Sequence, residues 1–184
     1  MLLVNEGCAA MTVQYHSIWL MPRDEDEQAF AVIVRNLAKR FDSPVFQPHL
    51  TLVEDMPRTC EELKPLLEQL TEGMASFTAP VDAVEESSLY YRSFYARFPV
   101  SVPLRTLKER AVGLFEVGSL ETFMPHISLA YGVPEGSEKT EAVTALRRDL
   151  QGMPVVFDRA CIVSSSQQTP IEDWAIRHSS RLQA

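Results

Sequence analysis

The chain has 184 residues and a formal net charge of −8, and its 46% hydrophobic and 23% charged residues are the proportions of an ordinary folded domain. The acidic balance argues against a broad surface for DNA or long RNA, because such surfaces need a basic stripe. No apolar run approaches the ~20 residues that span a bilayer, so no membrane partner is expected.

Residues 1–184 are expected to form a single bilobal domain, with residues 1–12 as a flexible N-terminal extension, because the first strand-like segment begins after Met11. The opening residues lack the basic start and long apolar stretch of a secretory signal. The odd number of cysteines and their spacing match no metal or redox motif, which favours a reducing compartment. We therefore expect a cytoplasmic protein, working as a monomer. The cysteines are Cys8, Cys60 and Cys161.

Hydrophobic spacing predicts strands and helices along the whole chain. Asp24 and Ser137 are predicted as helix N-caps, and Thr59 with Glu62 as a capping box. Pro65 is expected to kink or shorten the second helix. The predicted elements are, in order, a strand at 14–21, a helix at 25–40, a strand at 45–54, a helix between 59 and 73, a β-hairpin or two long strands at 77–98, a helix at 104–115, a strand at 123–131, a helix at 137–150, and strands at 155–164 and 171–179.

Two of the predicted strands, one in each half of the chain, carry nearly the same five residues. In each, side chains alternate between the two faces of the strand, so the histidine and the hydroxyl residue share one face. The aliphatic residues between them then point into a core. Each copy therefore presents an imidazole beside a hydroxyl. The copies are Pro48-His49-Leu50-Thr51-Leu52 and Pro125-His126-Ile127-Ser128-Leu129.

This pairing suits the cleavage of a phosphodiester. The reaction needs a base for the attacking oxygen and an acid for the leaving oxygen, and two histidines can supply both near neutral pH. Hydroxyls can donate hydrogen bonds to the non-bridging phosphate oxygens, where charge accumulates. One such motif alone is most often a packed or surface histidine. Two copies that match in residue type at five positions favour a catalytic role for His49, Thr51, His126 and Ser128.

The order of elements repeats helix, motif strand, helix in each half, which indicates an internal duplication. Short connections and mixed elements predict the α+β class with antiparallel sheets. Two similar lobes would place the two motif strands across a shared cleft.

The paired motifs resemble those of the two-histidine (2H) phosphoesterase superfamily, and the chain is most similar to its cyclic phosphodiesterase branch. The segment Ser17-Ile18-Trp19-Leu20-Met21-Pro22 resembles the first strand of that branch, and Phe46-Gln47-Pro48-His49 resembles its approach to the first motif. Tyr131 matches a tyrosine that the branch places near the substrate phosphate.

The resemblance implies a bilobal, duplicated α+β fold (RNA 2′-5′ ligase-like), in which two antiparallel β-sheets face each other across a central cleft, with helices on the outside. It implies metal-independent hydrolysis of a ribose cyclic phosphate, without a cofactor. One histidine would activate water and the other would protonate the leaving ribose oxygen, while Thr51 and Ser128 bind the phosphate. Which histidine is the base and which is the acid stays open.

Two aromatic residues are further substrate-binding candidates. Trp19 can stack on a base, because aromatic faces bind any nucleobase, and packing in the core is the equal alternative. Tyr131 can donate a hydrogen bond to phosphate. Arg92 and Arg97 can neutralise phosphate charge, although an arginine in a hairpin is usually solvated.

The remaining histidines and the second tryptophan are expected to have no part in the site. His16 and His178 are expected to be structural or surface residues, and Trp174 to lie in the core. No set of histidine, cysteine and carboxylate residues has the spacing of a metal site.

Three functions remain open. The first is an enzyme that opens a small cyclic-phosphate nucleotide, either ADP-ribose 1″,2″-cyclic phosphate or a nucleoside 2′,3′-cyclic phosphate. The second is an RNA 2′,3′-cyclic-end or 2′–5′ phosphodiesterase or an RNA ligase-like enzyme, which the acidic balance mildly disfavours. The third is a nucleotide-binding module without turnover, against which the intact histidine and hydroxyl pairs speak.

Overall fold

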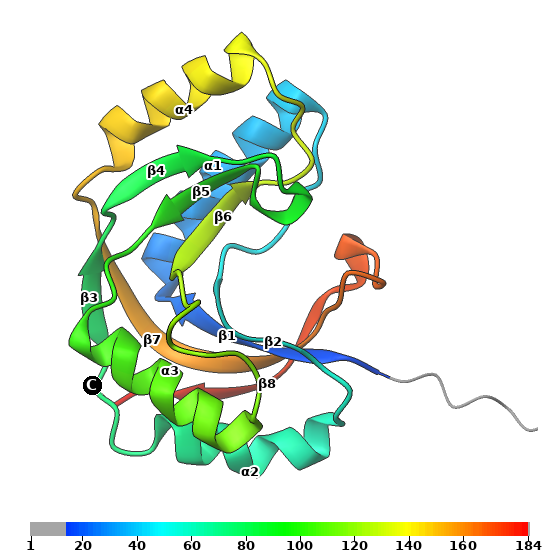
Figure 1. Ribbon diagram of the computed structural model, residues 1–184, viewed down its shortest axis with the longest axis vertical. Helices are drawn as coiled ribbons and strands as arrows, with labels where there is room; N and C mark the ends of the chain where they lie inside the picture. Colours follow the sequence, from blue (N-terminus) through cyan, green and yellow to red (C-terminus); the bar gives the residue numbers. More distant parts are fainter. Residues whose placement is uncertain (1–13, 184) are drawn as a thin grey trace, which may run out of the picture.

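A curled antiparallel sheet forms the centre of the structure, a computed structural model that describes residues 14–183 (Figure 1). The predicted extension at residues 1–12 lies outside the described residues. The strands are β1 (His16–Pro22), β2 (Leu50–Met56), β3 (Phe77–Pro80), β4 (Ala83–Glu86), β5 (Phe94–Arg97), β6 (His126–Ala130), β7 (Pro154–Ser164) and β8 (Ala175–Arg181). The helices are α1 (Asp24–Phe41), α2 (Cys60–Thr71), α3 (Val102–Phe115) and α4 (Ser137–Leu150), with short 3-10 turns η1 (Tyr90–Arg92) and η2 (Ile171–Asp173).

The sheet has two halves that meet at the motif strands. Its strand order is β3-β7-β1-β2-β6-β5-β4, with β8 pairing on β7. β2 and β6 are neighbours through a single register pair, Leu50 opposite Ile127. The two antiparallel sheets that were expected are therefore two halves of one sheet, which turns sharply where β2 meets β6 (Figure 1). The α+β class is confirmed.

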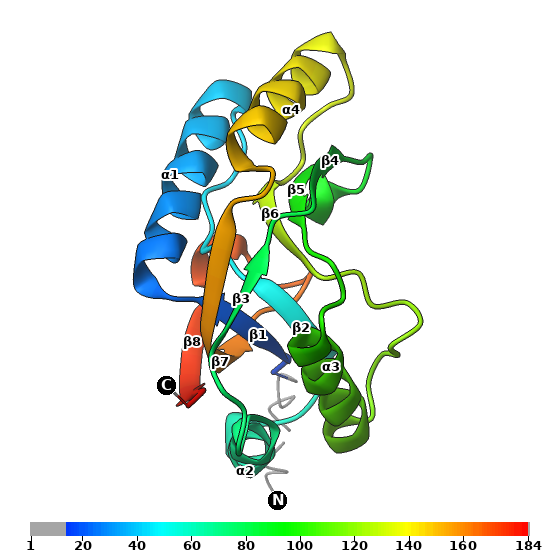
Figure 2. The same cartoon turned by 90° about the vertical axis from the view of Figure 1, so that its left-hand side faces the viewer.

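Helices cover the outer side of both halves, as expected. α1 contacts β6 and α4 contacts β4, whereas α2 contacts β7 and β8 and α3 contacts β2. Figure 2 shows α1 and α4 at one end of the molecule and α2 and α3 at the other. Since alternate strand residues point towards these helices, the opposite face is free to line a cleft. The buried strand residues include Ile18, Leu20, Leu50, Leu52, Ile127 and Leu129.

Helix ends differ from the predictions at two caps and agree at a third. Arg23, not Asp24, is the N-cap of α1, because the Arg23 amide still pairs with the Val156 carbonyl at 2.8 Å and the helix begins directly after it. Gly136, not Ser137, is the N-cap of α4. The capping box of α2 is confirmed, and α2 continues through Pro65 instead of being shortened there.

The strands differ from the predictions mainly in extent and partners. The segment predicted as a hairpin or two long strands contains three short strands, of which β4 and β5 form a hairpin and β3 pairs with β7. Both motif strands begin late, β2 at Leu50 and β6 at His126. The residues before each histidine, Pro48 and Pro125, have no N–H to donate, so the ladder does not extend through them.

Candidate active site

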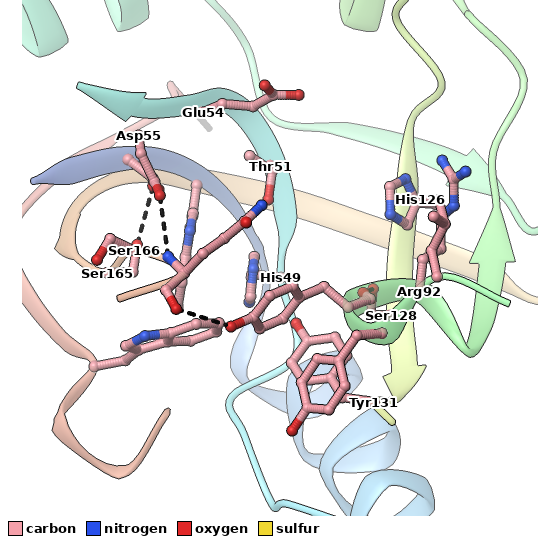
Figure 3. Close-up of a pocket in the computed structure, with 17 residues that line it drawn as sticks. His49, Thr51, Glu54, Asp55, Arg92, His126, Ser128, Tyr131, Ser165 and Ser166 are labelled. Carbon is pink, nitrogen blue, oxygen red and sulfur yellow. Dashed lines mark hydrogen bonds between the residues drawn. The ribbon is translucent and has the colours of Figure 1, made fainter. Parts of the chain in front are cut away.

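The concave side of the sheet contains a cleft of about 680 Å³ that is lined from both halves. Its walls come from β1, β2, β6, the η1 turn and the loop between β7 and β8 (Figure 3). The structure brings all four residues of the predicted catalytic set to this cleft: His49, Thr51, His126 and Ser128.

The two histidines have the same backbone environment. The His49 Nδ1 donates to the Gln47 carbonyl at 2.7 Å, and the His126 Nδ1 donates to the Met124 carbonyl at 2.8 Å. A carbonyl can only accept, so each neutral ring carries its proton on Nδ1 and keeps a lone pair on Nε2. The motif therefore fixes each ring through the backbone two residues upstream and leaves Nε2 available for proton transfer.

Burial lowers the pKa of both histidines in the free protein. Burial lowers the pKa of His49 to about 3. The hydrogen bond to the Gln47 carbonyl raises this pKa in part, and the nearby His126 lowers it further. The pKa of His126 is also lowered, first by burial, with an opposing hydrogen bond to Met124 and a lowering by the Arg92 charge. Both imidazoles are therefore neutral near pH 7, with Nε2 free to accept a proton.

The two hydroxyls differ in their partners. The Ser128 hydroxyl donates to the Tyr91 carbonyl at 3.0 Å, which ties β6 to the η1 turn. The Thr51 hydroxyl faces the cleft and makes no hydrogen bond with any other residue from 14 to 183. Thr51 can therefore donate directly to a ligand, whereas the Ser128 proton is already committed.

Trp19 lies against His49. The two rings are 3.4 Å apart and within 3° of parallel, because β1 and β2 pair with Trp19 opposite Thr51. Only 3% of Trp19 is exposed, which leaves little of its surface for the predicted contact with a nucleobase. The stack fixes the plane of the His49 ring and excludes water from one side of it.

Tyr131 lines the same cleft from the end of β6. Its ring stacks on Phe46 at 3.7 Å, and the residue is 3% exposed. Burial raises the pKa of Tyr131, opposed by a contact with Ser128, so its hydroxyl stays protonated as a hydrogen-bond donor. Its predicted contact with phosphate stays a prediction.

Several cleft residues were not found by sequence reasoning. Trp174, interpreted as core, lies half-buried in the cleft with its ring 5.8 Å from Trp19. The Tyr91 hydroxyl donates to the Gln167 carbonyl at 3.4 Å and so joins the η1 turn to the β7–β8 loop. The sequence signal was only local: a run of aromatics at Tyr90 and Tyr91, and a polar segment between the last two strands.

A carboxylate holds the β7–β8 loop at the first half of the cleft. Asp55 accepts from the Ser17 hydroxyl at 2.8 Å and from the Gln167 amide at 3.2 Å. The Ser165 hydroxyl donates to the Ser17 hydroxyl at 3.0 Å. This network positions the loop on β1 and β2 and closes that side of the cleft.

The other histidines lie outside the cleft, as expected. The His16 ring nitrogen is 2.8 Å from the Arg58 carbonyl, and His178 lies on β8. Among residues 14–183, no three histidine, cysteine or carboxylate residues gather closely enough to hold a metal ion. No helix in that range is long and apolar enough to cross a membrane.

A family model described as cyclic phosphodiesterase-like protein matches residues 14–178. The chain belongs to this family. This membership confirms the 2H phosphoesterase superfamily and makes the protein a phosphodiesterase by family. The cyclic phosphodiesterase of Arabidopsis thaliana is 24% identical over 163 residues, which cover 86% of this chain and 90% of the relative.

Solved structures share the fold of this cyclic phosphodiesterase-like chain. E. coli LigT complexed with 3′-AMP superposes with a TM-score of 0.59 at 14% identity, over 94% of this chain and 100% of LigT. TT0787 of Thermus thermophilus gives a TM-score of 0.55 at 19% identity, over 92% of this chain and 98% of TT0787.

Proposed function

We propose that the protein is a metal-independent cyclic nucleotide phosphodiesterase that opens a ribose cyclic phosphate, using His49 and His126 as general base and general acid. The observation that carries this proposal is the matched pair of imidazoles. Each is held through Nδ1 by a carbonyl, and both line one cleft with Nε2 free. Two such groups are the requirement for moving one proton to each side of a phosphoryl transfer.

The reaction balances with these two groups alone. One neutral histidine takes a proton from water as the water oxygen bonds to phosphorus. The bond from phosphorus to one ribose oxygen breaks, and the other histidine, in its protonated form, gives its proton to that oxygen. The product is a ribose phosphomonoester, and proton exchange with solvent resets both rings. Because both histidines are neutral in the free protein, the negative charge of the bound phosphate favours protonation of the acid.

Thr51 and Tyr131 are proposed to hold the phosphate, while the Ser128 hydroxyl, which donates to the Tyr91 carbonyl, holds β6 against the η1 turn. The Thr51 hydroxyl is free to donate to a non-bridging oxygen, and Tyr131 keeps its proton at any physiological pH. Trp19 acts in this proposal through the ring of His49. Action as a monomer is part of the proposal.

A small nucleotide is the proposed substrate class. The volume of the cleft, about 680 Å³, is that of a pocket for one small ligand. The contact between Tyr91 and Gln167 joins both sides of the cleft, and the net charge of −8 disfavours tracking along RNA. The name of the Arabidopsis relative and the 3′-AMP complex of LigT agree with this class.

A turnover screen in EDTA tests the proposal. It compares ADP-ribose 1″,2″-cyclic phosphate, nucleoside 2′,3′-cyclic phosphates and a 2′–5′ oligonucleotide, with the products identified by phosphorus NMR. We expect a single monoester regioisomer from a cyclic substrate. Turnover of the oligonucleotide alone would assign the RNA-directed alternative, and binding without turnover would assign a nucleotide-binding module. Activity that is lost in EDTA and restored by one divalent metal would reject the mechanism.

A further inference from the structure

We propose that Arg92 binds the substrate phosphate directly. On the His126 side of the cleft, where the Ser128 proton is already donated to a carbonyl, Arg92 supplies the hydrogen-bond donor together with a positive charge. This inference rests on the proposed function, because it names a further residue for the same phosphate. It is carried by five features of the structure: the charge of the cleft, the lack of a partner for Arg92, the position of its guanidinium beside His126, the hydrogen bond that occupies Ser128, and the rigidity of the η1 turn.

The cleft contains one arginine and no lysine among the described residues that line it. That arginine is Arg92, and it contributes to the second half of the cleft. The first half carries two exposed carboxylates, Glu54 and Asp55. A protein of net charge −8 needs a local cation to attract an anionic ligand, and Arg92 is the group in this cleft that can do so. The phosphate is therefore drawn towards the half that contains His126.

Arg92 has no carboxylate partner among residues 14–183, and its Nε is buried without a hydrogen bond there. Arg97, in the same β-hairpin, is paired with Asp82 at 3.0 Å and with Glu85 at 3.1 Å. The usual interpretation of a hairpin arginine as a solvated or structurally paired residue therefore fits Arg97 and fails for Arg92. A half-buried guanidinium without an anion is a costly group unless a ligand completes it.

The Arg92 guanidinium lies beside His126 (Figure 3). It lies over the Tyr95 ring, with its central carbon 5.4 Å from the ring centre. The Tyr95 ring in turn lies nearly perpendicular to the ring of His126, with the two ring centres 5.5 Å apart. Figure 3 shows Arg92 beside His126 on the wall opposite Thr51. The Arg92 charge is close enough to lower the pKa of His126, so an anion placed between them would interact with both.

The two motif hydroxyls are not equivalent, and Arg92 lies on the side where the hydroxyl is occupied. A serine hydroxyl has one proton, and that of Ser128 goes to the Tyr91 carbonyl at 3.0 Å. The Thr51 hydroxyl is free on the other side of the cleft. A guanidinium offers five donors in a planar fork that suits two phosphate oxygens at once. The duplicated motif thus supplies one free hydroxyl, and Arg92 completes the other half.

The turn that carries Arg92 is held in place before any ligand binds. The Gly132 amide donates to the Tyr90 carbonyl at 2.8 Å, and the Val133 amide donates to the Ser93 hydroxyl at 3.0 Å. The Ser87 hydroxyl donates to the Arg92 carbonyl at 2.7 Å. Gly132 has a φ of +64°, and a Cβ there would lie 2.6 Å from the Tyr90 ring, so close packing of the turn requires glycine. A donor on such a turn is preorganised.

Arg92 moves no proton in this proposal, because its guanidinium stays charged throughout. Its part is electrostatic. When water adds to phosphorus, negative charge grows on the non-bridging oxygens, and a fixed cation there favours the transition state over the ground state. The same interaction should favour the dianionic monoester product over the monoanionic cyclic substrate.

The test compares Arg92→Gln, Arg92→Lys and a control, Arg105→Gln, which removes the same charge from an exposed position on α3 outside the cleft. For a nucleoside 2′,3′-cyclic phosphate, we expect Arg92→Gln to lower kcat/KM by about 10²–10³-fold, the scale for one lost donor to developing charge. Arg92→Lys should recover part of this loss, because it keeps the charge without the fork. Arg105→Gln should match the wild type.

Two further measurements separate direct contact from a structural role. The two diastereomers of a 2′,3′-cyclic phosphorothioate place sulfur at one or the other non-bridging position. The wild-type enzyme should prefer one diastereomer, and Arg92→Gln should reduce that preference several-fold, which a loosened turn would not do selectively. The Kd of the nucleoside 2′-monophosphate, followed by calorimetry, should rise at least tenfold in Arg92→Gln.

The outcomes distinguish this inference from the proposed function. If the wild type opens no cyclic phosphate, the proposed function fails, and the Kd of the 2′-monophosphate still decides on Arg92. An unchanged Kd in Arg92→Gln, or no binding of the monophosphate to the wild type, overturns the inference. If the wild type turns over and Arg92→Gln keeps its rate and its diastereomer preference, only the inference fails. Should Arg92→Gln not fold, as judged by its thermal melt, Arg92→Lys carries the same comparisons.

Discussion

His49 and His126 occupy equivalent positions in the two halves of the cleft, and each donates from Nδ1 to a carbonyl two residues earlier. Their neighbours differ. The flat face of His49 is covered by Trp19, whereas the ring of His126 lies nearly perpendicular to that of Tyr95 and has Arg92 nearby. One half thus surrounds its imidazole with an apolar ring, and the other with a polar and charged wall.

This difference shows what an internal duplication keeps and what it changes. The backbone hydrogen bond that orients each imidazole is the same in both halves, because the motif itself encodes it. The residues that decide the pKa come from β1, η1 and β5, which are not equivalent between the halves. Two chemically identical side chains can therefore take two roles, provided that their environments separate their proton affinities.

The largest expected effect comes from removing either imidazole. His49→Ala and His126→Ala should each lower kcat by about 10²–10⁴-fold, the usual scale for one general acid or base. The double variant should lose far less than the product of the two, because the residues act as a unit. Steady-state kinetics on a cyclic substrate measures this, with His178→Ala, on β8 outside the cleft, as the control. A near-wild-type rate in either folded variant would contradict the paired mechanism.

The next effect concerns stability. The unfolded chain binds a proton at His49 below its ordinary pKa of 6.5, whereas the folded protein does not until about pH 3. The free energy of unfolding should therefore fall as the pH drops below 6.5, with His49 contributing about 1.4 kcal/mol per pH unit.

Urea unfolding between pH 6.5 and 5 measures that slope. His49→Gln should flatten it, and His126→Gln should flatten it as well, because burial lowers the pKa of both histidines. Equal slopes for the wild type and His49→Gln would mean that His49 is hydrated in the folded protein.

The third prediction concerns the pH dependence of the rate. The acid must carry a proton, and the pKa values of His49 and His126 both lie below 6.5 in the free protein. The charged group that faces His126 is Arg92 on η1, and Tyr95 on β5 packs against the same ring. As the pH rises through the higher of these two values the proton is lost, so kcat/KM should decline above a midpoint below pH 6.5.

The decline of kcat with rising pH should have its midpoint at a higher pH than the decline of kcat/KM, because the bound phosphate anion raises the pKa of the acid. Full profiles of both constants in buffers of constant ionic strength test this pair of statements. Rates that keep rising past pH 9 would mean that these two histidines are not the acid and the base.

The smallest expected effect separates the two hydroxyls. Thr51→Ala should lower kcat/KM by about tenfold, because it removes one hydrogen bond to a charged group. Ser128→Ala should cost less in kcat/KM and more in stability, since its hydroxyl joins β6 to the Tyr91 carbonyl. Kinetics and thermal melts of Thr51→Ser and Ser128→Thr serve as the conservative controls. A greater kinetic loss at Ser128 than at Thr51 would show that the serine hydroxyl turns towards the phosphate when the substrate binds.

The sequence alone determined the elements and the paired histidine motifs. Alternation with period two and helical spacing are local properties, so the four helices and the motif strands could be predicted within a few residues. The same alternation placed His49 with Thr51 and His126 with Ser128 on the face that lines the cleft. The motif pair also sufficed for the superfamily, because its five residue types occur twice.

Only the tertiary structure decided which distant residues join these motifs. The pairing of β3 with β7, the stack of Trp19 on His49 and the position of Trp174 in the cleft depend on strand neighbours far away in the chain. Arg92 and Arg97 look alike in the sequence, and they differ only because Asp82 and Glu85 reach one of them. Local spacing carries no information about such long-range contacts, since they are set by how the two halves of the sheet turn towards each other where β2 meets β6.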